Sequence, residues 1–177
     1  MLLIALKGFS GCGKSTISRA LSQKLGWPLI DKDDIRDLLD DTIPLVGGLA
    51  YEVMFNVARR QLQQGLSVIC DSPLTGSISY ERAQAISREA HASLAILECV
   101  CSDSSNWEQR INARKTLQLP VHHQTDWHSF QHFLQQPATQ ESYTITHPHL
   151  IIDTSQPLDV CLTEIMAWLE RLVHYSA

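Results

Sequence analysis

The sequence lacks the long apolar runs and linker-like segments that mark membrane proteins and disordered proteins. No run approaches the roughly 18 apolar residues that a membrane-spanning helix needs. A signal peptide is not expected either, because Lys7 and a glycine-rich turn interrupt the apolar start of the chain too early. With 44% apolar and 19% charged residues and few glycines and prolines, the 177-residue chain is typical of one soluble globular domain.

An excess of positive charge is also missing. The chain has 14 lysines and arginines against 19 aspartates and glutamates, which gives a formal net charge of −5. Nucleic-acid backbones select basic surfaces, so this balance argues against a nucleic-acid partner, although it does not exclude a local basic pocket.

The cysteines form neither a disulfide framework nor a metal-binding CxxC pair. Their number is odd, and Cys70 and Cys99 lie in apolar, strand-like runs, where cysteine behaves as a small hydrophobic residue. The pattern suits a reducing compartment, and we expect a cytoplasmic protein that does not contact a membrane. The five are Cys12, Cys70, Cys99, Cys101 and Cys161.

Short apolar runs alternate with helix-length stretches along the chain. Continuous apolar strands, each followed by a helix, are typical of a parallel sheet covered on both faces. We therefore predict a three-layer α/β/α fold with about five parallel strands in one domain, residues 1–177. The expected strands are residues 2–6, 28–30, 67–70, 94–100 and 150–152. The expected helices are residues 14–25, a stretch through 38–39, and residues 51–64, 80–91, 107–116 and 158–175.

Residues 8–15, GFSGCGKS, match the P-loop motif G-x-x-x-x-G-K-[ST], which binds nucleotide phosphates. Glycines let the backbone curl so that successive N–H groups point at a phosphate, and the following helix adds the positive end of its dipole. Lys14 is expected to reach the β- and γ-phosphates of ATP, and the Ser15 hydroxyl to ligate Mg²⁺. The alternative is a tight turn that binds nothing, but such a turn has no need of the Lys-Ser pair. The predicted nucleotide-binding residues here are Gly8, Ser10, Gly11, Cys12, Gly13, Lys14, Ser15 and Thr16, of which Cys12 only fills a free position.

Aspartates follow the second and third expected strands. Asp71 comes directly after the apolar residues 67–70, as the magnesium-binding aspartate of P-loop proteins does, and we assign it to the metal or to a substrate. The alternative for Asp71 is a cap of the next helix.

The second strand runs into DKDDIR, residues 31–36. An acid beside the γ-phosphate can accept the proton of an attacking hydroxyl, and an arginine one helical turn later can hold the substrate. We assign these roles to Asp33 and Arg36 and give Asp31 and Asp34 structural roles. The alternative is that Asp33 or Asp34 is a helix N-cap and Arg36 a solvated residue.

These motifs resemble the P-loop kinases of the adenylate-kinase-like group, such as adenylylsulfate kinase, gluconate kinase, chloramphenicol phosphotransferase and zeta toxin. The resemblance is carried by IDKDDIR at residues 30–36, and it is stronger still to poorly characterised P-loop ATP-binding proteins with a DKDD-x-R segment. The further matching segments are AxxQL at 58–62, VIxDSPL at 68–74, EC at 98–99 and WxxRxxxR at 107–114. The resemblance thus covers most of the chain.

The resemblance implies a small helical lid at about residues 107–147, from which Arg110 and Arg114 neutralise charge during transfer. It also implies that the loop 153–157 lines the adenine, through Thr154 and Pro157. Taken alone, Arg110 and Arg114 are two arginines at i and i+4 on one helical face, which is normally a solvated stripe. Two features depart from the family pattern: Lys32 replaces the usual glycine between the strand-two aspartates, and residues 119–143 are longer than a minimal lid.

Histidines and aromatic residues gather within residues 122–133. A metal site would use His128 and His132 with His122 or His123, but no HExxH motif or cysteine accompanies them. The helical spacing of Trp127, Phe130, Phe133 and Leu134 favours a short lid helix that packs its aromatic side chains on the body of the protein.

These observations lead to the hypothesis of an Mg²⁺-dependent kinase that transfers the ATP γ-phosphoryl group to a hydroxyl of a small-molecule acceptor. The catalytic residues would be Lys14, Asp33, Arg110 and Arg114, with Asp33, Arg36 and Asp71 on the substrate and Ser15 and Asp71 on the metal. Two alternatives stay open: a nucleotide-dependent switch or ATPase adaptor, and a polynucleotide or nucleotide-sugar kinase that resembles zeta toxin.

Overall fold

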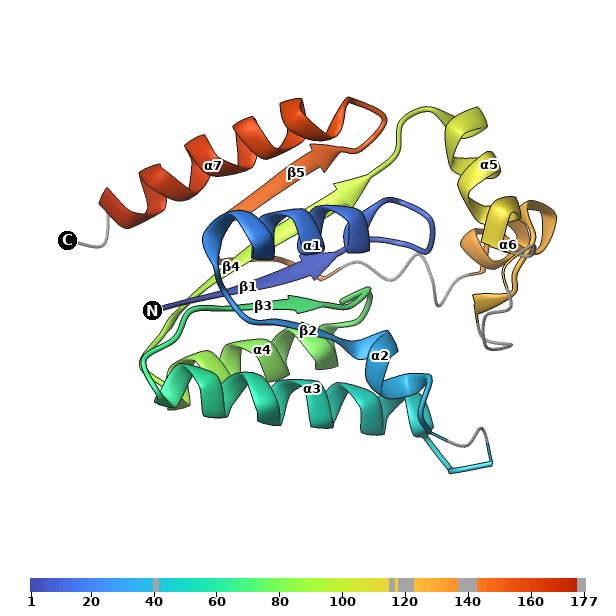
Figure 1. Cartoon of the computed structure of the whole chain (residues 1–177). Helices are drawn as coiled ribbons and strands as arrows, with labels where there is room; N and C mark the ends of the chain where they lie inside the picture. The colour runs from blue at the N-terminus through green and yellow to red at the C-terminus, as the bar shows by residue number, and fades with distance from the viewer. Residues whose placement is uncertain (40–41, 115–116, 118–122, 137–142, 175–177) are drawn as a thin grey trace.

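A computed structural model describes residues 1–39, 42–114, 117, 123–136 and 143–174. Its centre is a five-stranded, all-parallel sheet with the strand order β2-β3-β1-β4-β5, shown in Figure 1. The strands are β1 (Leu2–Lys7), β2 (Leu29–Asp31), β3 (Val68–Asp71), β4 (Ser93–Val100) and β5 (His149–Asp153). The predicted α/β fold with five parallel strands is confirmed.

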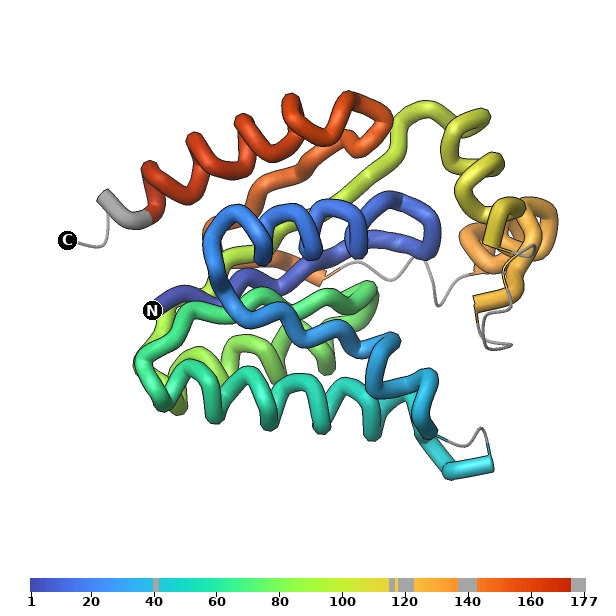
Figure 2. Tube along the Cα trace, in the orientation of Figure 1, coloured from blue at the N-terminus to red at the C-terminus, as the bar shows by residue number. Residues whose placement is uncertain are grey.

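Helices cover both faces of this sheet, so the fold has three layers (Figures 1 and 2). α1 and α7 lie on one face, and α3 and α4 lie on the other. The helices are α1 (Lys14–Leu25), α2 (Lys32–Arg36), α3 (Val46–Gln63), α4 (Ser77–Glu89), α5 (Ser104–Arg114), α6 (Trp127–Leu134) and α7 (Leu158–His174).

Strand β1 shows why the central strands are apolar throughout. Successive side chains of a strand point to opposite faces, and both faces of this sheet are covered. Leu3 and Ala5 belong to the core beneath α3 and α4, whereas Ile4 and Leu6 belong to the core beneath α1 and α7. All four side chains are fully buried, so these four positions favour apolar residues.

The structure corrects two helix boundaries. The helix expected through residues 38–39 ends at Arg36, and Leu38 is 88% exposed, because one apolar turn here has no core to pack against. α3 begins at Val46, five residues before the expected start at 51, and includes Gly47 and Gly48. The helical spacing of buried apolar residues begins only at Ala50, where α3 reaches the core. The first turn of α3 is outside the core, so the sequence there does not indicate a helix.

The lid range predicted at 107–147 contains two kinds of structure. α5 and α6 lie beyond the carboxyl ends of the strands (Figure 1). Tyr143 and Ile145, in contrast, pack against the core beneath α3 and α4. The end of this range is therefore part of the body of the domain.

All five cysteines are buried, and none of them forms a disulfide. Of the helices in the described part of the chain, none combines the length and the apolar character that crossing a membrane requires.

Candidate nucleotide site

The turn between β1 and α1 is a backbone cradle that only glycine can form. Gly8, Gly11 and Gly13 have φ angles of 138°, 74° and 88°, which L side chains rarely adopt. A Cβ on Gly8 would lie 2.3 Å from the backbone oxygen of Cys99, and one on Gly13 would lie 2.9 Å from Thr154 Oγ1. The glycines thus allow the turn to lie directly against the ends of β4 and β5.

Helix α1 begins directly from this turn. Its N-cap is Gly13, which has no side chain to bond the first-turn N–H groups, and the first turn contains no acidic residue. Lys14 lies across the turn, where its Nζ donates to the Phe9 carbonyl oxygen at 2.9 Å. N–H groups, a helix dipole and an ammonium therefore converge on one spot, which is the arrangement that binds phosphate.

Asp71 closes β3 beside α1 and is almost completely buried. Its Oδ2 accepts a hydrogen bond of 2.9 Å from Ser18 Oγ, one helical turn after Ser15. The N-cap of α4 is Gly76, so Asp71 does not cap that helix. The alternative that Asp71 caps the next helix is thereby removed.

The end of β3 is also connected to the P-loop. Gly8 N–H donates to the Pro73 carbonyl at 3.0 Å. Leu74 follows with a positive φ of 46°, and two tyrosines hold its backbone: Leu74 N–H donates to Tyr51 Oη at 3.2 Å, and the Tyr143 hydroxyl donates to Leu74 O. The sequence analysis missed Tyr51 and Tyr143, because no feature of the neighbouring residues indicates that a side chain supports the distant turn at Leu74.

A cavity of about 380 Å³ lies beside the P-loop, between α5 and the loop that follows β5. It is lined by Gly11, Gly13, Ser15, Thr16, Ile17, Arg110, Ala113, Arg114, Leu117, Thr154, Gln156, Leu158 and Cys161. The structure thus places the predicted residues Ser15, Thr16, Arg110, Arg114 and Thr154 around one space. Pro157 is not among the lining residues, although its neighbours are.

Thr154 joins three parts of this site. Its hydroxyl donates to the Cys12 carbonyl at 2.7 Å and accepts from Arg110 Nη1 at 2.9 Å, and its carbonyl accepts from Arg110 Nη2 at 2.7 Å. Arg110 therefore holds the loop after β5 against the P-loop. The buried Cys12 thiol, whose pKa burial raises, lies 3.9 Å from Lys14 Nζ, measured from its sulfur.

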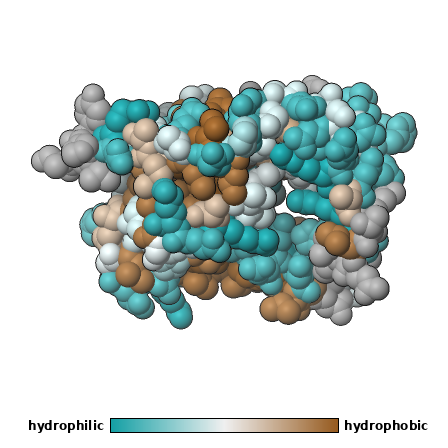
Figure 3. Space-filling model, turned by 45° about the horizontal axis from the view of Figure 1, so that its top comes forward, coloured by the Kyte–Doolittle hydropathy of each residue, from teal (hydrophilic) through white to brown (hydrophobic). Residues whose placement is uncertain are grey.

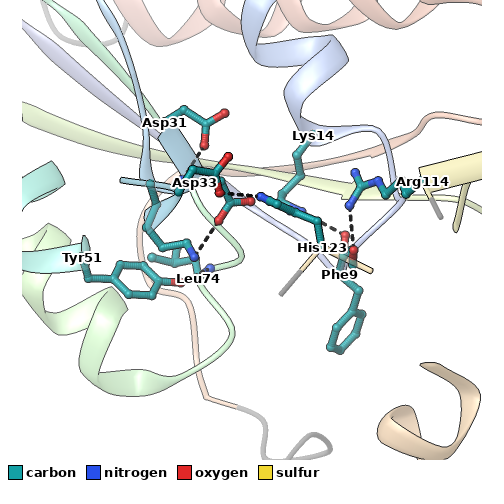
Figure 4. A network of polar contacts seen from close by, with 11 residues as sticks. Phe9, Lys14, Asp31, Asp33, Tyr51, Leu74, Arg114 and His123 are labelled. Carbon is teal, nitrogen blue, oxygen red and sulfur yellow. Dashed lines mark hydrogen bonds and ion pairs between the residues drawn. The ribbon is translucent and has the colours of Figure 1, made fainter. Parts of the chain in front are cut away.

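Helix α5 contacts the P-loop directly. Trp107 Nε1 donates to the Ser10 carbonyl at 2.8 Å, and Arg114 Nη1 donates to Ser10 Oγ at 2.8 Å. A Cβ on Gly11 would lie 2.8 Å from Ile111 Cγ1, so the second P-loop glycine is needed for this helix to approach. Arg114 points at the phosphate cradle, as Figure 4 shows.

Helix α6 packs its aromatic residues on α5 and on the P-loop, as predicted. The Phe130 ring lies 5.4 Å from Trp107 and 6.4 Å from Phe9, and Trp127 lies 5.8 Å from Trp107, measured between ring centroids. His122 lies outside the described residues. Within the described part of the chain, no three His, Cys, Asp or Glu side chains are grouped closely enough to hold a metal.

The acids at the ends of β2 and β3 lie side by side. Asp31 and Asp71 are register partners, and burial together with the charge of Asp71 raises the pKa of Asp31 to about 6. Asp31 is also the N-cap of α2, because its Oδ1 accepts from Asp33 N–H at 2.9 Å. The structural role predicted for Asp31 is confirmed, and Asp33 is not the cap.

Asp33 faces the P-loop lysine across the end of the sheet (Figure 4). Burial alone would raise its pKa, but the hydrogen bond and charge of Lys32, with His123 and Lys14 nearby, lower it. Near Asp33, His123 Nε2 and Asp37 Oδ1 lie 2.7 Å apart, which joins the segment before α6 to the end of α2. Arg36 Nη1 donates to Leu39 O at 3.3 Å. Sequence reasoning noted Lys32 only as a departure from the family pattern.

Residues 3–136 match the family model of an AAA domain. The chain belongs to this AAA-domain family. A search of curated protein sequences gave no significant match.

Solved structures similar to this AAA-domain chain include three proteins described as kinases. A candidate kinase from Chloroflexus aurantiacus is 24% identical with a TM-score of 0.77, and the alignment covers 96% of this chain and 97% of that one. A gluconokinase from Sinorhizobium meliloti is 20% identical, with a TM-score of 0.63 and coverage of 98% and 96%. The APS kinase of Mycobacterium tuberculosis, solved with AMPPNP and APS, is 14% identical, with a TM-score of 0.65 and coverage of 95% and 96%. These likenesses show that the chain shares the overall fold of these three proteins.

The close approach at Gly8 predicts a large loss of stability in Gly8→Ala. Gly26→Ala is a matched control, because Gly26 also has a positive φ, of 67°, but a Cβ there would meet no atom within 4 Å. We expect the control to lose about 1–2 kcal/mol from backbone strain, and Gly8→Ala to lose clearly more because a carbonyl cannot rotate away. Urea denaturation measures both losses, and equal values would show that the contact with Cys99 is unimportant.

Asp31 predicts that stability falls as the pH rises between about 4 and 6. The folded protein keeps the Asp31 proton up to a pKa of about 6, whereas an unfolded aspartate loses it near its usual value of 3.8. Asp31→Asn removes this titration and keeps an N-cap. Relative to this variant, the wild type should lose on the order of 1–2 kcal/mol of unfolding free energy across the interval. Asp159→Asn, at an exposed helix start, serves as control, and parallel wild-type and Asp31→Asn curves would contradict the prediction.

Proposed function

We propose that this protein is an ATP- and Mg²⁺-dependent kinase that transfers the γ-phosphoryl group to a hydroxyl of a small-molecule acceptor. The observation that carries the proposal is the convergence of Lys14, Asp33 and Arg114 on one space at the carboxyl ends of the strands (Figure 4). Ligands of open parallel sheets bind at this end. The similar structures described as a gluconokinase and an APS kinase support this class of activity.

The residues present fit a bound nucleotide. The turn has glycine at Gly8, Gly11 and Gly13, where any side chain would clash with neighbouring atoms, so its backbone stays open to a phosphate. In the proposal, the backbone of residues 8–13 and the start of α1, with Lys14, Ser15 and Thr16, hold the phosphates. The cavity beside α5, with Thr154 and the neighbours of Pro157, takes the nucleoside. Ser15 and Asp71 would hold Mg²⁺, which, when bound, supplies positive charge to the β- and γ-phosphates.

In the proposal, Asp33 and Arg36 receive the acceptor. Asp33 is ionised near neutral pH, since its pKa is lowered, so it acts mainly by orienting the hydroxyl through a hydrogen bond. The acceptor oxygen forms a bond to the γ-phosphorus, and the bond from this phosphorus to the bridging oxygen breaks. The electron pair leaves with ADP, and the hydroxyl proton passes to the Asp33 carboxylate or to water.

We assign different roles to the two arginines of α5. Arg114 reaches the P-loop at Ser10 and would neutralise charge on the transferred phosphoryl group. Arg110 donates to the hydroxyl and to the carbonyl oxygen of Thr154 and would shape the nucleoside cavity. In this proposal residues 1–177 act as one kinase domain, with α5 and α6 as its lid.

Figure 3 shows the surface hollowed between the body of the domain and the end that carries α5 and α6. An acceptor can enter there without displacing the core. The buried free cysteines fit a reducing, cytoplasmic location.

Labelled ATP, incubated with the protein and fractionated metabolite pools, tests the activity directly. We expect a phosphorylated small molecule, because the acceptor side of the site carries an aspartate and an arginine. If only free phosphate forms, and a protein partner raises its rate, the activity is that of a nucleotide-dependent switch and the kinase proposal is wrong.

Two variants separate nucleotide binding from transfer. Lys14→Met should abolish ATP binding and turnover. Asp33→Asn should keep the ATP affinity within a few-fold but lower transfer by about 10²–10⁴-fold. Asp34→Asn, at the exposed neighbour, is the matched control and should transfer at the wild-type rate. Calorimetry measures binding and product formation measures transfer, and full transfer by Asp33→Asn would remove Asp33 from the mechanism.

A further inference from the structure

Lys32 makes a contact that its place in the sequence does not explain. It is the first residue of α2, and its Nζ lies 2.7 Å from Oδ1 of the next residue, Asp33. Adjacent side chains of a helix do not face each other, so helix geometry alone does not bring this pair together. The Lys32 side chain is 12% exposed and that of Asp33 is 40% exposed, so the cation lies deeper than the acid it contacts.

Tyr51 of α3 holds Lys32 in this position. The Lys32 ammonium lies 5.7 Å from the centre of the Tyr51 ring, within the range of a cation–π contact. The tyrosine is itself fixed, because its ring stacks on Phe55 at 6.0 Å and its hydroxyl accepts from Leu74 N–H. A rigid part of the body therefore places the cation beside Asp33.

Several other charged groups surround the Asp33 carboxylate. Lys14 faces it from α1 and His123 faces it from the segment before α6, and both stabilise its charge. Asp31 lies two residues earlier, and the negative charges of Asp31 and Asp33 repel each other. Lys32 gives the largest favourable contribution to the ionised Asp33, and it is also the group that contacts a single, named oxygen.

We propose that Lys32 is a positioning residue for Asp33, which it holds through Oδ1 so that Oδ2 is presented to the acceptor hydroxyl. This inference rests on the proposed kinase function. A carboxylate rotates about its last bond, and one fixed oxygen sets the direction of the other. The same ammonium keeps the carboxylate ionised, so the acceptor meets a hydrogen-bond acceptor and not a neutral acid.

The role can be tested by ¹³C NMR titration of the Asp33 carboxyl carbon in the free protein, which needs no acceptor. Lys32→Met should raise the pKa of Asp33, and Lys32→Arg should keep it near the wild-type value because a cation remains. Lys24→Met, which removes an exposed lysine at the end of α1, is the control and should change nothing. An unchanged Asp33 titration in Lys32→Met overturns the proposal.

Phosphoryl transfer gives the second readout. Lys32→Met should lower kcat about tenfold or more, move the acid limb of the pH profile to higher pH, and leave the ATP affinity unchanged. Lys32→Arg should restore most of the rate. A rate loss with an unmoved acid limb, and no rescue by arginine, would show a merely structural role for Lys32.

A variant of the supporting ring covers the case in which Lys32→Met does not fold. Tyr51→Leu removes the ring beneath the ammonium, whereas Tyr51→Phe keeps the ring and removes only the hydroxyl. The proposal expects the Asp33 pKa to rise in Tyr51→Leu but not in Tyr51→Phe, and equal values in both overturn it. If the protein transfers phosphate to no acceptor while these titrations behave as expected, the kinase function is wrong and the positioning of Asp33 stands.

Discussion

The site depends on how closely the backbone of residues 8–13 approaches the ends of three neighbouring segments. The P-loop contacts the end of β3 through Gly8 and Pro73, the loop after β5 through Cys12 and Thr154, and helix α5 through Ser10 and Trp107. Each contact is a hydrogen bond to main-chain atoms at a glycine-rich turn. A phosphate cradle needs rigid N–H groups, and this turn gains its rigidity from its neighbours, since glycine by itself is the most flexible residue.

The charges around the cradle follow from the order of the strands. Because β2, β3 and β1 are adjacent, Asp31, Asp71 and Lys14 meet at one edge of the sheet. The pKa of Asp31 rises mainly because the carboxyl is buried, and the negative charge of the adjacent Asp71 raises it further. Asp33, two residues further along the chain, has cations on several sides and its pKa falls. Two aspartates of one tetrapeptide therefore have pKa values shifted in opposite directions: that of Asp31, which caps a helix, is raised, and that of Asp33 is lowered.

The helices beyond the sheet are part of the site as well as its cover. Arg110 holds the loop after β5, Arg114 reaches Ser10, and the aromatic residues of α6 pack on α5 and Phe9. Because these contacts end on the P-loop, a movement of α5 would change the shape of both the phosphate cradle and the cavity beside it. Helices α5 and α6 and the P-loop are thus directly connected in this structure.

The sequence by itself determined the alternation of strands and helices, the parallel sheet and the P-loop. Both the spacing of apolar residues and the glycine-lysine motif are properties of residues that are neighbours in the chain. The sequence also placed Asp71 at a strand end and Arg110 and Arg114 on one helix face. Only the tertiary structure decided which aspartate caps α2, that Ser18 bonds Asp71, and that Tyr51 and Tyr143 support Leu74. The physical reason is that these roles depend on contacts between segments that are distant in the chain. Lys32, for example, is held beside Asp33 by the ring of Tyr51, nineteen residues later in the sequence and on another helix.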